Sequence, residues 1–289
     1  MAVIECSGRA ASGKKGGEHE QACINRPNNC RLRTTALTTA LAFLLILTGW
    51  SPALAQDADA KRVLKAMSDY VTSQQHFSLK YDVDLEVITP QVEKLQFSSS
   101  GEATLSRPDK LRVARAGGYA DVELIFDGKT VTVVGKHTNV FAQFESPGSI
   151  DQALDRLRTE HFIEMPGADL LLSNIYDELV AGVIEAKHIG RGIVDGIECE
   201  HLAFRNQETD WQLWVEVGET PVPRKYVITS KTLAAAPQYT LRIKDWQTDA
   251  PPDAQQFTFT APQGAKAVEF SALTDIGELP PSATVEKEQ

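Results

Sequence analysis

Cysteine is scarce in this sequence of 289 residues, which contains four cysteines. Three of them, Cys6, Cys23 and Cys30, lie within the first 55 residues, so Cys199 is alone in the rest of the chain. A lone cysteine cannot form an intrachain disulfide. A fold that depends on disulfides is therefore excluded for residues 56–289.

Basic residues are outnumbered by acidic ones. The chain has 29 Lys and Arg against 39 Asp and Glu, a net charge of −10, and residues 56–289 alone carry 23 against 36, a net charge of −13. A nucleic-acid partner is disfavoured, because no basic stripe is available to displace counterions from phosphates. Steady adsorption to an anionic membrane surface is disfavoured for the same reason.

Long apolar runs are also missing. The longest, Ala36–Leu47, is too short to cross a bilayer comfortably, since about 20 residues are needed. Its flanks are those of a secretory signal, with basic Arg26, Arg31 and Arg33 before it and the small-residue site Ala53-Leu54-Ala55 after it. We predict that residues 1–55 are a signal peptide cleaved after Ala55. An over-extended start and an uncleaved anchor are open alternatives, and no integral membrane span is expected in the mature chain.

The sequence contains no established catalytic motif, neither a Gly-x-Ser-x-Gly elbow nor a His-Glu-x-x-His run. Cys199 and His201 could be considered as a catalytic nucleophile and its base. However, neighbours on one strand face are about 7 Å apart, which is too far for such a pair. A metal site made by this pair with His188 or a glutamate lacks a recognised ligand spacing. We therefore predict a protein that is not an enzyme, with no catalytic residue, no metal and no cofactor.

What the sequence does contain is alternation of apolar and polar residues. From Phe77 to Val87 every second residue is apolar, which predicts a strand with one buried face. The dipeptides Asp127-Gly128 and Asp195-Gly196 predict tight hairpin turns. Three consecutive strands are predicted within 196–229, and others at 95–105, 111–113, 122–126, 129–134, 140–144, 184–193, 226–230, 238–246 and 257–259.

Two regions have helical spacing instead. Residues 57–75 place apolar side chains on one face, and residues 150–180 predict two helical segments, with Ser149 as the first cap and Pro166-Gly167 between them. The flanking strands are already paired as hairpins, so these helices are not crossovers. The predicted fold is mainly β (α+β): a curled antiparallel sheet forming an incomplete β-barrel, with an N-terminal helix and a central helical insertion as plug or lid.

Two groups of segments resemble known families. The first resembles the lipoprotein-carrier superfamily (LolA/LolB-like) and consists of residues 106–112, 126–129 and 257–265. The second resembles, more closely, a family of predicted periplasmic proteins of unknown function and consists of residues 194–196, 201–204, 210–214 and 221–225. The resemblance covers about residues 57–270 and implies a half-open barrel in a Gram-negative periplasm, whose better-known relatives hold acyl chains of lipoproteins or other lipids.

The composition of the two ends and this resemblance together predict a signal peptide over residues 1–55, a single LolA-like half-barrel domain over 56–270 and a loosely ordered tail over 271–289. The expected function is that of a soluble periplasmic binding or carrier protein for an apolar ligand, such as a lipid or a lipoprotein acyl chain. A non-catalytic scaffolding domain of the envelope with no ligand is the alternative, and the oligomeric state is left open. The candidate ligand-binding residues are inward-facing apolar residues of the strands: Leu79, Tyr81, Val83, Leu85, Leu124, Phe126, Leu213, Val215, Leu241 and Ile243.

Overall fold

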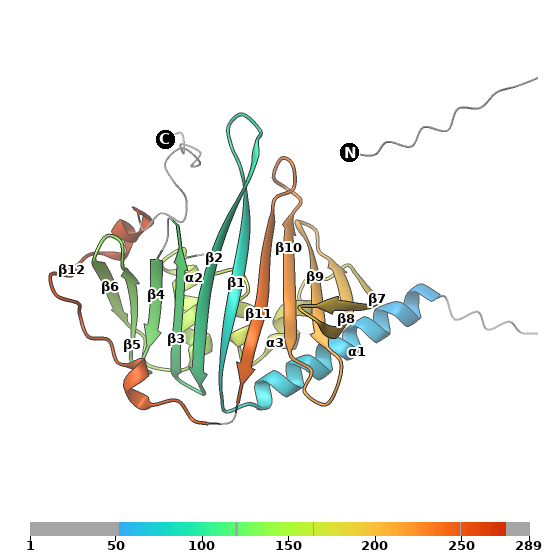
Figure 1. The fold of residues 1–289 in the computed structure, drawn as a ribbon, viewed down its shortest axis with the longest axis horizontal. Helices are drawn as coiled ribbons and strands as arrows, with labels where there is room; N and C mark the ends of the chain where they lie inside the picture. Colours follow the sequence, from blue (N-terminus) through green and yellow to red (C-terminus); the bar gives the residue numbers. More distant parts are fainter. Residues whose placement is uncertain (1–51, 119–120, 164, 249, 276–289) are drawn as a thin grey trace, which may run out of the picture. The chain divides into compact units, whose positions relative to one another are not determined.

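The structure is a computed structural model that describes residues 52–118, 121–163, 165–248 and 250–275 (Figure 1). Most of the predicted signal peptide lies outside the described residues; its last residues, 52–55, belong to the first helix. The predicted tail from residue 271 also lies largely outside them, apart from residues 271–275, which end a short 3-10 helix.

A twelve-stranded sheet organises the described part of the chain. Its strands are β1 (His76–Ile88), β2 (Lys94–Ser106), β3 (Lys110–Gly117), β4 (Asp121–Phe126), β5 (Thr130–Gly135), β6 (Val140–Glu145), β7 (Glu185–Val194), β8 (Ile197–Arg205), β9 (Thr209–Glu216), β10 (Pro223–Ser230), β11 (Gln238–Gln247) and β12 (Lys266–Ala267). Their order across the sheet is β12-β6-β5-β4-β3-β2-β1-β11-β10-β9-β8-β7. Neighbours pair antiparallel except β12 with β6, and within the described residues the sheet ends at β12 and β7 without closing into a barrel. The predicted fold class is confirmed.

The hairpin turns follow from their residues. Asp195 and Gly196 both have positive φ angles, 49° and 84°, as a two-residue turn between twisted strands requires. At the other predicted turn, Gly128 has a φ of 91°, and the Asp127 side chain accepts hydrogen bonds from the backbone N–H groups of Lys129 and Thr130 at 2.9 and 2.7 Å. These local interactions fix the register of the strands on either side.

The predicted strand at 257–259 is wrong. Residues Ala254–Phe257 form the 3-10 helix η2, whose start is capped by the Asp253 side chain accepting from the backbone N–H of Gln255. Phe257 is buried while its neighbour Thr258 is exposed, so the alternation comes from a segment that packs on strands without pairing with them. A side-chain hydrogen bond joins this segment to the sheet: the Arg112 guanidinium donates to the backbone carbonyl of Gln256 at 2.8 Å.

The helices cover one face of the sheet (Figure 1). They are α1 (Pro52–Ser73), α2 (Ile150–Thr159), the 3-10 helix η1 (Ala168–Leu171), α3 (Ile175–Val180) and the 3-10 helix η3 (Phe270–Asp275). Helix α1 packs on β7, β8 and β9 and contacts α3. Helix α2 starts with a capping box, in which the Ser149 hydroxyl accepts from the backbone N–H of Gln152 at 3.3 Å and the Gln152 side chain accepts from that of Ser149 at 3.0 Å. The predicted cap at Ser149 is confirmed.

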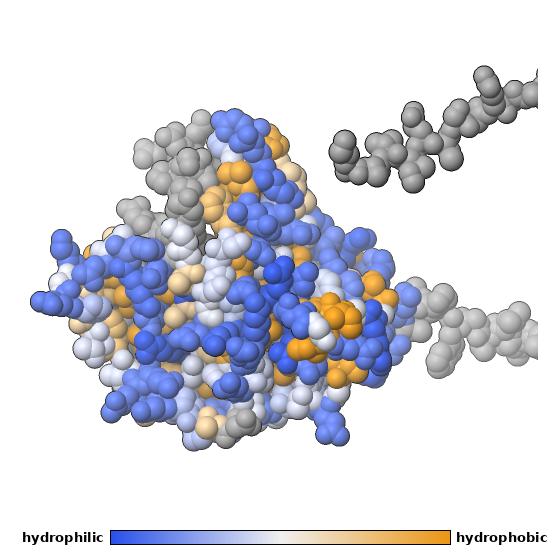
Figure 2. Space-filling view, viewed as in Figure 1, coloured by the Kyte–Doolittle hydropathy of each residue, from blue (hydrophilic) through white to orange (hydrophobic). Residues whose placement is uncertain are grey.

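The two faces of the sheet differ in polarity. On the face under the helices, Phe77, Leu79, Tyr81 and Val83 are buried, while the residues between them are partly or fully exposed. Figure 2 shows the other face, which is mostly hydrophilic apart from a hydrophobic area where β7 and β8 lie. The sheet therefore has one apolar face to bury, and the helices bury it.

The buried apolar side of α1 should contribute to the stability of the protein, and truncating a side chain on it should lower the free energy of unfolding. Met67 is fully buried on this side, so Met67→Ala should lower the free energy of unfolding by about 2–5 kcal/mol. Arg62 lies on the exposed side of the same helix, and Arg62→Ala should change the free energy by less than about 0.5 kcal/mol. Urea unfolding of both variants measures the difference, and equal losses would contradict the burial of the apolar side.

Candidate ligand-binding cavity

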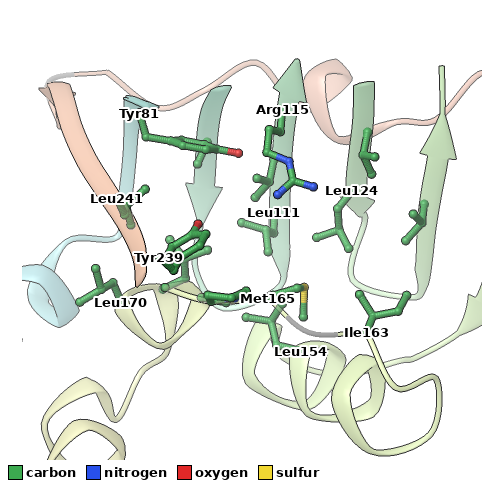
Figure 3. A pocket seen from close by; sticks show the side chains of 18 of the residues that line it. Tyr81, Leu111, Arg115, Leu124, Leu154, Ile163, Met165, Leu170, Tyr239 and Leu241 are labelled. Carbon is green, nitrogen blue, oxygen red and sulfur yellow. The ribbon is translucent and has the colours of Figure 1, made fainter. Parts of the chain in front are cut away.

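A cavity of about 370 Å³ lies between the apolar face of the sheet and the helical insertion (Figure 3). The sheet contributes residues from β1–β5 and β11, the insertion contributes residues from Leu154 to Leu171, and η3 contributes Phe270 and Leu273. Nearly all of these side chains are apolar. The size is within the range of small-molecule binding sites, about 300–1,000 Å³.

The strand wall of the cavity is set by the register. Pairing places Leu79, Ala103, Val113, Leu124 and Val133 side by side across β1 to β5, and all five line the cavity. The next row lies two positions further along each strand, and each of its members is at most 2% exposed. It consists of Phe77, Leu105, Leu111, Phe126 and Val131. This second row, called here the closed row, blocks one end of the cavity.

The opposite wall comes from the insertion, which supplies Leu154, Ile163, Met165 and Leu170 (Figure 3). The insertion is bound internally by an ion pair between Arg158 of α2 and Asp169 of η1, with 2.6 Å between Nη2 and Oδ1. Gly167 lies against the sheet, because a Cβ there would be 3.0 Å from Cδ2 of Leu241. Its φ of 86° also favours glycine, so the close approach of the insertion to β11 depends on this residue.

Tyr81 forms part of the strand wall in a fixed position. Its hydroxyl donates to the carbonyl of Ala114 at 3.1 Å, across the intervening strand β2. The ring passes over Gly101, where a Cβ would collide both with the ring and with that carbonyl. Glycine at position 101 therefore allows a large aromatic side chain to lie across the sheet.

Besides Tyr81 and Tyr239, three other side chains that line the cavity carry polar groups: Arg115 of β3, His161 after α2 and Trp246 of β11. The His161 ring contacts Phe144 and Phe270, with centroid distances of 4.3 and 4.2 Å. The Trp246 ring stacks on Phe77 at 4.5 Å. Both Nε2 of His161 and Nε1 of Trp246 are buried and have no hydrogen-bond partner among the described residues.

The structure places five of the ten predicted ligand-binding residues in the wall of this cavity. They are Leu79, Tyr81, Leu124, Leu241 and Ile243. Their contact with a ligand stays a prediction.

The other five predicted residues lie outside the cavity: four are packed in the core, and Leu85 faces a neighbouring pocket. Leu213 and Val215 are on β9, in the half of the sheet that α1 covers, and are at most 1% exposed. Phe126 belongs to the closed row, and Val83 is packed in the core beside Leu241. Leu85 lines a neighbouring pocket of about 420 Å³, which shares Met165, Pro166 and Tyr239 with the cavity.

Sequence reasoning missed Arg115 and the residues of the insertion. Arg115 could have been found, because it follows Leu111 and Val113 at two-residue spacing on the same strand face. The residues around Met165 carry no such signal, since they lie outside helices and strands with regular periodicity.

The pair Cys199 and His201 does not form a reactive site. Burial and the nearby Glu216 carboxylate raise the pKa of the Cys199 thiol to about 11, which disfavours the thiolate that a nucleophile requires. The His201 ring stacks on Trp214 at 4.1 Å, and its Nε2 is 2.9 Å from the side-chain oxygen of Gln212. His188 instead contacts Glu200, and no group of three or more metal-binding side chains was found in the described residues.

An open antiparallel sheet that holds an apolar cavity under a helical insertion defines a half-barrel fold. The chain belongs to the family described as predicted periplasmic protein (DUF2092), whose sequence model matches residues 60–271. This confirms the family expected from the sequence. A comparison with curated proteins found no significant match, and none of the described helices has the length and apolar character that a membrane span requires.

Solved structures similar to this chain have low sequence identity. An uncharacterized conserved protein from Thermus thermophilus is 11% identical, with a TM-score of 0.43 over 73% of this chain and 99% of that one. Lipoprotein LppX from Mycobacterium tuberculosis is 11% identical, with a TM-score of 0.35 over 68% and 100%. A LolA superfamily protein from Nitrosomonas europaea is 12% identical, with a TM-score of 0.32 over 69% and 97%. These TM-scores are all below 0.5 and support no inference about function.

The packing of Tyr81 on Gly101 predicts the effect of adding one methyl group. Gly101→Ala should lower the free energy of unfolding by about 1–3 kcal/mol, because the tyrosine ring and a backbone carbonyl must both move. Gly118→Ala is the matched control, since no heavy atom of the described residues lies within 4 Å of the Cβ it would add. Urea unfolding with near-ultraviolet circular dichroism compares the two, and equal effects would contradict the close packing.

The environment of His201 predicts a loss of stability in acid. Burial, followed by repulsion from Lys225 and His188, lowers the pKa of His201, although the bond to Gln212 opposes this shift. A depressed folded-state pKa means that the unfolded chain takes up the proton first as the pH falls below about 6.5, so this stabilisation is present above that pH and is lost below it. His201→Gln should therefore weaken the dependence of stability on pH between 7.5 and 5. Unfolding curves across this range measure it, and an unchanged slope would refute the assignment.

Proposed function

We propose that the protein is a periplasmic binding or carrier protein that holds an apolar ligand, such as the acyl chain of a lipid or lipoprotein, between the sheet and the insertion. The observation that carries this proposal is the apolar cavity of about 370 Å³. Protein interiors are normally packed as densely as organic crystals, and an empty apolar space loses dispersion contacts on all its walls. An apolar ligand would restore those contacts.

Binding would be driven by removing apolar surface from water. Each Å² of buried apolar surface contributes about 25 cal/mol, from which the cost of association must be subtracted. A closed row at one end and the insertion on the other side limit how far a ligand can enter. Entry and release would require the insertion to move away from β11.

The compartment is supported by two observations. The family is described as predicted periplasmic protein, and residues 1–55 have the composition of a signal peptide with cleavage after Ala55. Export would place the half-barrel domain of residues 56–270 in water between two membranes. There an apolar molecule would need to be sheltered in order to cross.

A non-catalytic scaffolding domain of the envelope is the second candidate. The half of the sheet under α1 favours it, because Leu202, Leu213 and Val215 are at most 1% exposed and leave that half filled by side chains. A scaffold has no need of a cavity in the other half. Ligand content therefore separates the two candidates.

Filling the cavity should abolish ligand binding without unfolding the protein. In Ala103→Phe the new ring would occupy the cavity, whereas Thr104→Phe places the same ring on the opposite face of β2. We expect lipid to co-purify with the wild type and with Thr104→Phe, and at least about tenfold less with Ala103→Phe, since tenfold corresponds to about 1.4 kcal/mol.

Native mass spectrometry and lipid extraction measure the bound lipid, and circular dichroism confirms that each variant is folded. Val133→Phe is a second filling variant should Ala103→Phe prove unstable. A wild-type protein that carries no lipid and binds none when offered it would refute the carrier and leave the scaffold.

A further inference from the structure

The cavity has a wide end and a narrow end. Strand β11 lines the wide end with four residues, from Tyr239 to Trp246, whereas among the described residues of β5 only Val133 lines the narrow end. From β11 to β5 the cavity crosses five pairs of neighbouring strands. At about 4.8 Å for each pair, this is roughly 24 Å across the strands. On β1 to β5 the longest lined stretch, Leu111 to Arg115, is roughly 13 Å along a strand. A long, thin molecule would therefore fit best across the strands.

The C-terminal segment closes the narrow end. Phe270 and Leu273 of η3 line the cavity, and η3 contacts β6, the strand beyond β5. The centroid of the Phe270 ring is 5.2 Å from that of Phe144 on β6 and 4.2 Å from that of His161. Among the described residues of β6, none lines the cavity. The three rings therefore form a wall between the cavity and β6.

The apolar face of the sheet continues behind this wall. Val133 of β5 pairs with Ala142 of β6, so both side chains lie on the same face. Ala142 is 1% exposed and, unlike Val133, does not line the cavity. The cavity thus ends because other residues pack on β6, and not because the apolar face ends there.

The wide end adjoins polar groups. It shares Met165, Pro166 and Tyr239 with the neighbouring pocket of about 420 Å³, whose other lining residues include Glu86 and Gln238. A polar group that is buried without a hydrogen bond costs free energy. A ligand with one polar group would therefore direct that group toward this pocket and its hydrocarbon end toward η3.

We propose that the ligand is a single unbranched hydrocarbon chain that lies across the strands with its end against Phe270 and Leu273, so that η3 sets the maximal chain length. This inference rests on the proposed function, and it adds the orientation of the ligand and the residues that select its length. Each further methylene group that is buried raises the affinity roughly fourfold. A chain longer than the cavity must displace η3 or leave methylene groups in water.

The test offers the full chain an equimolar mixture of decanoate, tetradecanoate, octadecanoate and docosanoate, each below its micelle concentration. Native mass spectrometry measures how much of each is bound. All four share one head group, so a difference in occupancy reports the length of the chain. We expect the occupancy of the wild type to rise with length to a maximum and to fall again for docosanoate.

Variants of η3 show whether this segment is the cause. Phe270→Ala opens the narrow end, so the ratio of bound docosanoate to bound tetradecanoate should rise by at least about fourfold, the value of one further buried methylene group. Leu273→Ala is a second opening variant, and Phe270→Trp extends the wall and should lower the ratio. Phe259→Ala is the matched control, because Phe259 is a half-buried aromatic residue of the same C-terminal segment that contacts Phe141 and does not line the cavity. It should leave the ratio unchanged.

The outcomes separate the two proposals. Occupancy of the wild type that keeps rising up to docosanoate, or a ratio that the variants of η3 leave unchanged, would refute the role of η3 and leave the carrier function intact. Failure of all four chains to bind would refute the proposed function itself. Retained binding of tetradecanoate serves as the check that each variant is folded, and Phe270→Trp decides should both opening variants fail it.

Discussion

Burial of one apolar face of a twelve-stranded sheet is the constraint on which the rest of the structure depends. The strands share a register that collects their apolar side chains on that face, and the face is too wide for one helix to cover. The β7–β9 half is covered by α1, whose side chains fill the space. The β1–β5 half is covered by the insertion, which leaves a cavity. The same driving force thus gives a packed core in one half and a binding site in the other.

Much of the fold could be predicted from the sequence, because strands and hairpins are encoded locally. The alternation from Phe77 predicts which side of β1 is buried, and Asp195-Gly196 predicts the turn between β7 and β8. The error at residues 257–259 shows the limit of this reasoning. Two aromatic residues at strand spacing also fit an extended segment that packs across a sheet, and only the cap at Asp253 distinguishes a 3-10 turn there.

The candidate site was less predictable, for a physical reason. Leu124 and Leu213 have the same pattern in the sequence, but one faces the cavity and the other faces α1. The difference depends on where helices distant in sequence are placed, and alternation contains no information on this. The cation of the site was visible in principle, since a strand that reads Leu111, Val113, Arg115 has a charge on its apolar face. The predicted site contained apolar and aromatic residues alone and therefore omitted Arg115.

The C-terminal segment has a consequence for the behaviour of the protein at high concentration. After β11 in the middle of the sheet, the chain passes β3 at Gln256, places Phe259 in a tilted contact with Phe141 and then forms β12 beside β6. An unpaired outer strand is a template for hydrogen bonding to another molecule. Here the chain's own backbone occupies part of that template, since the N–H groups of Lys266 and Val268 donate to Asn139 and Phe141. Residues 266–268 thus leave fewer backbone groups at this border of the sheet with which another molecule could pair.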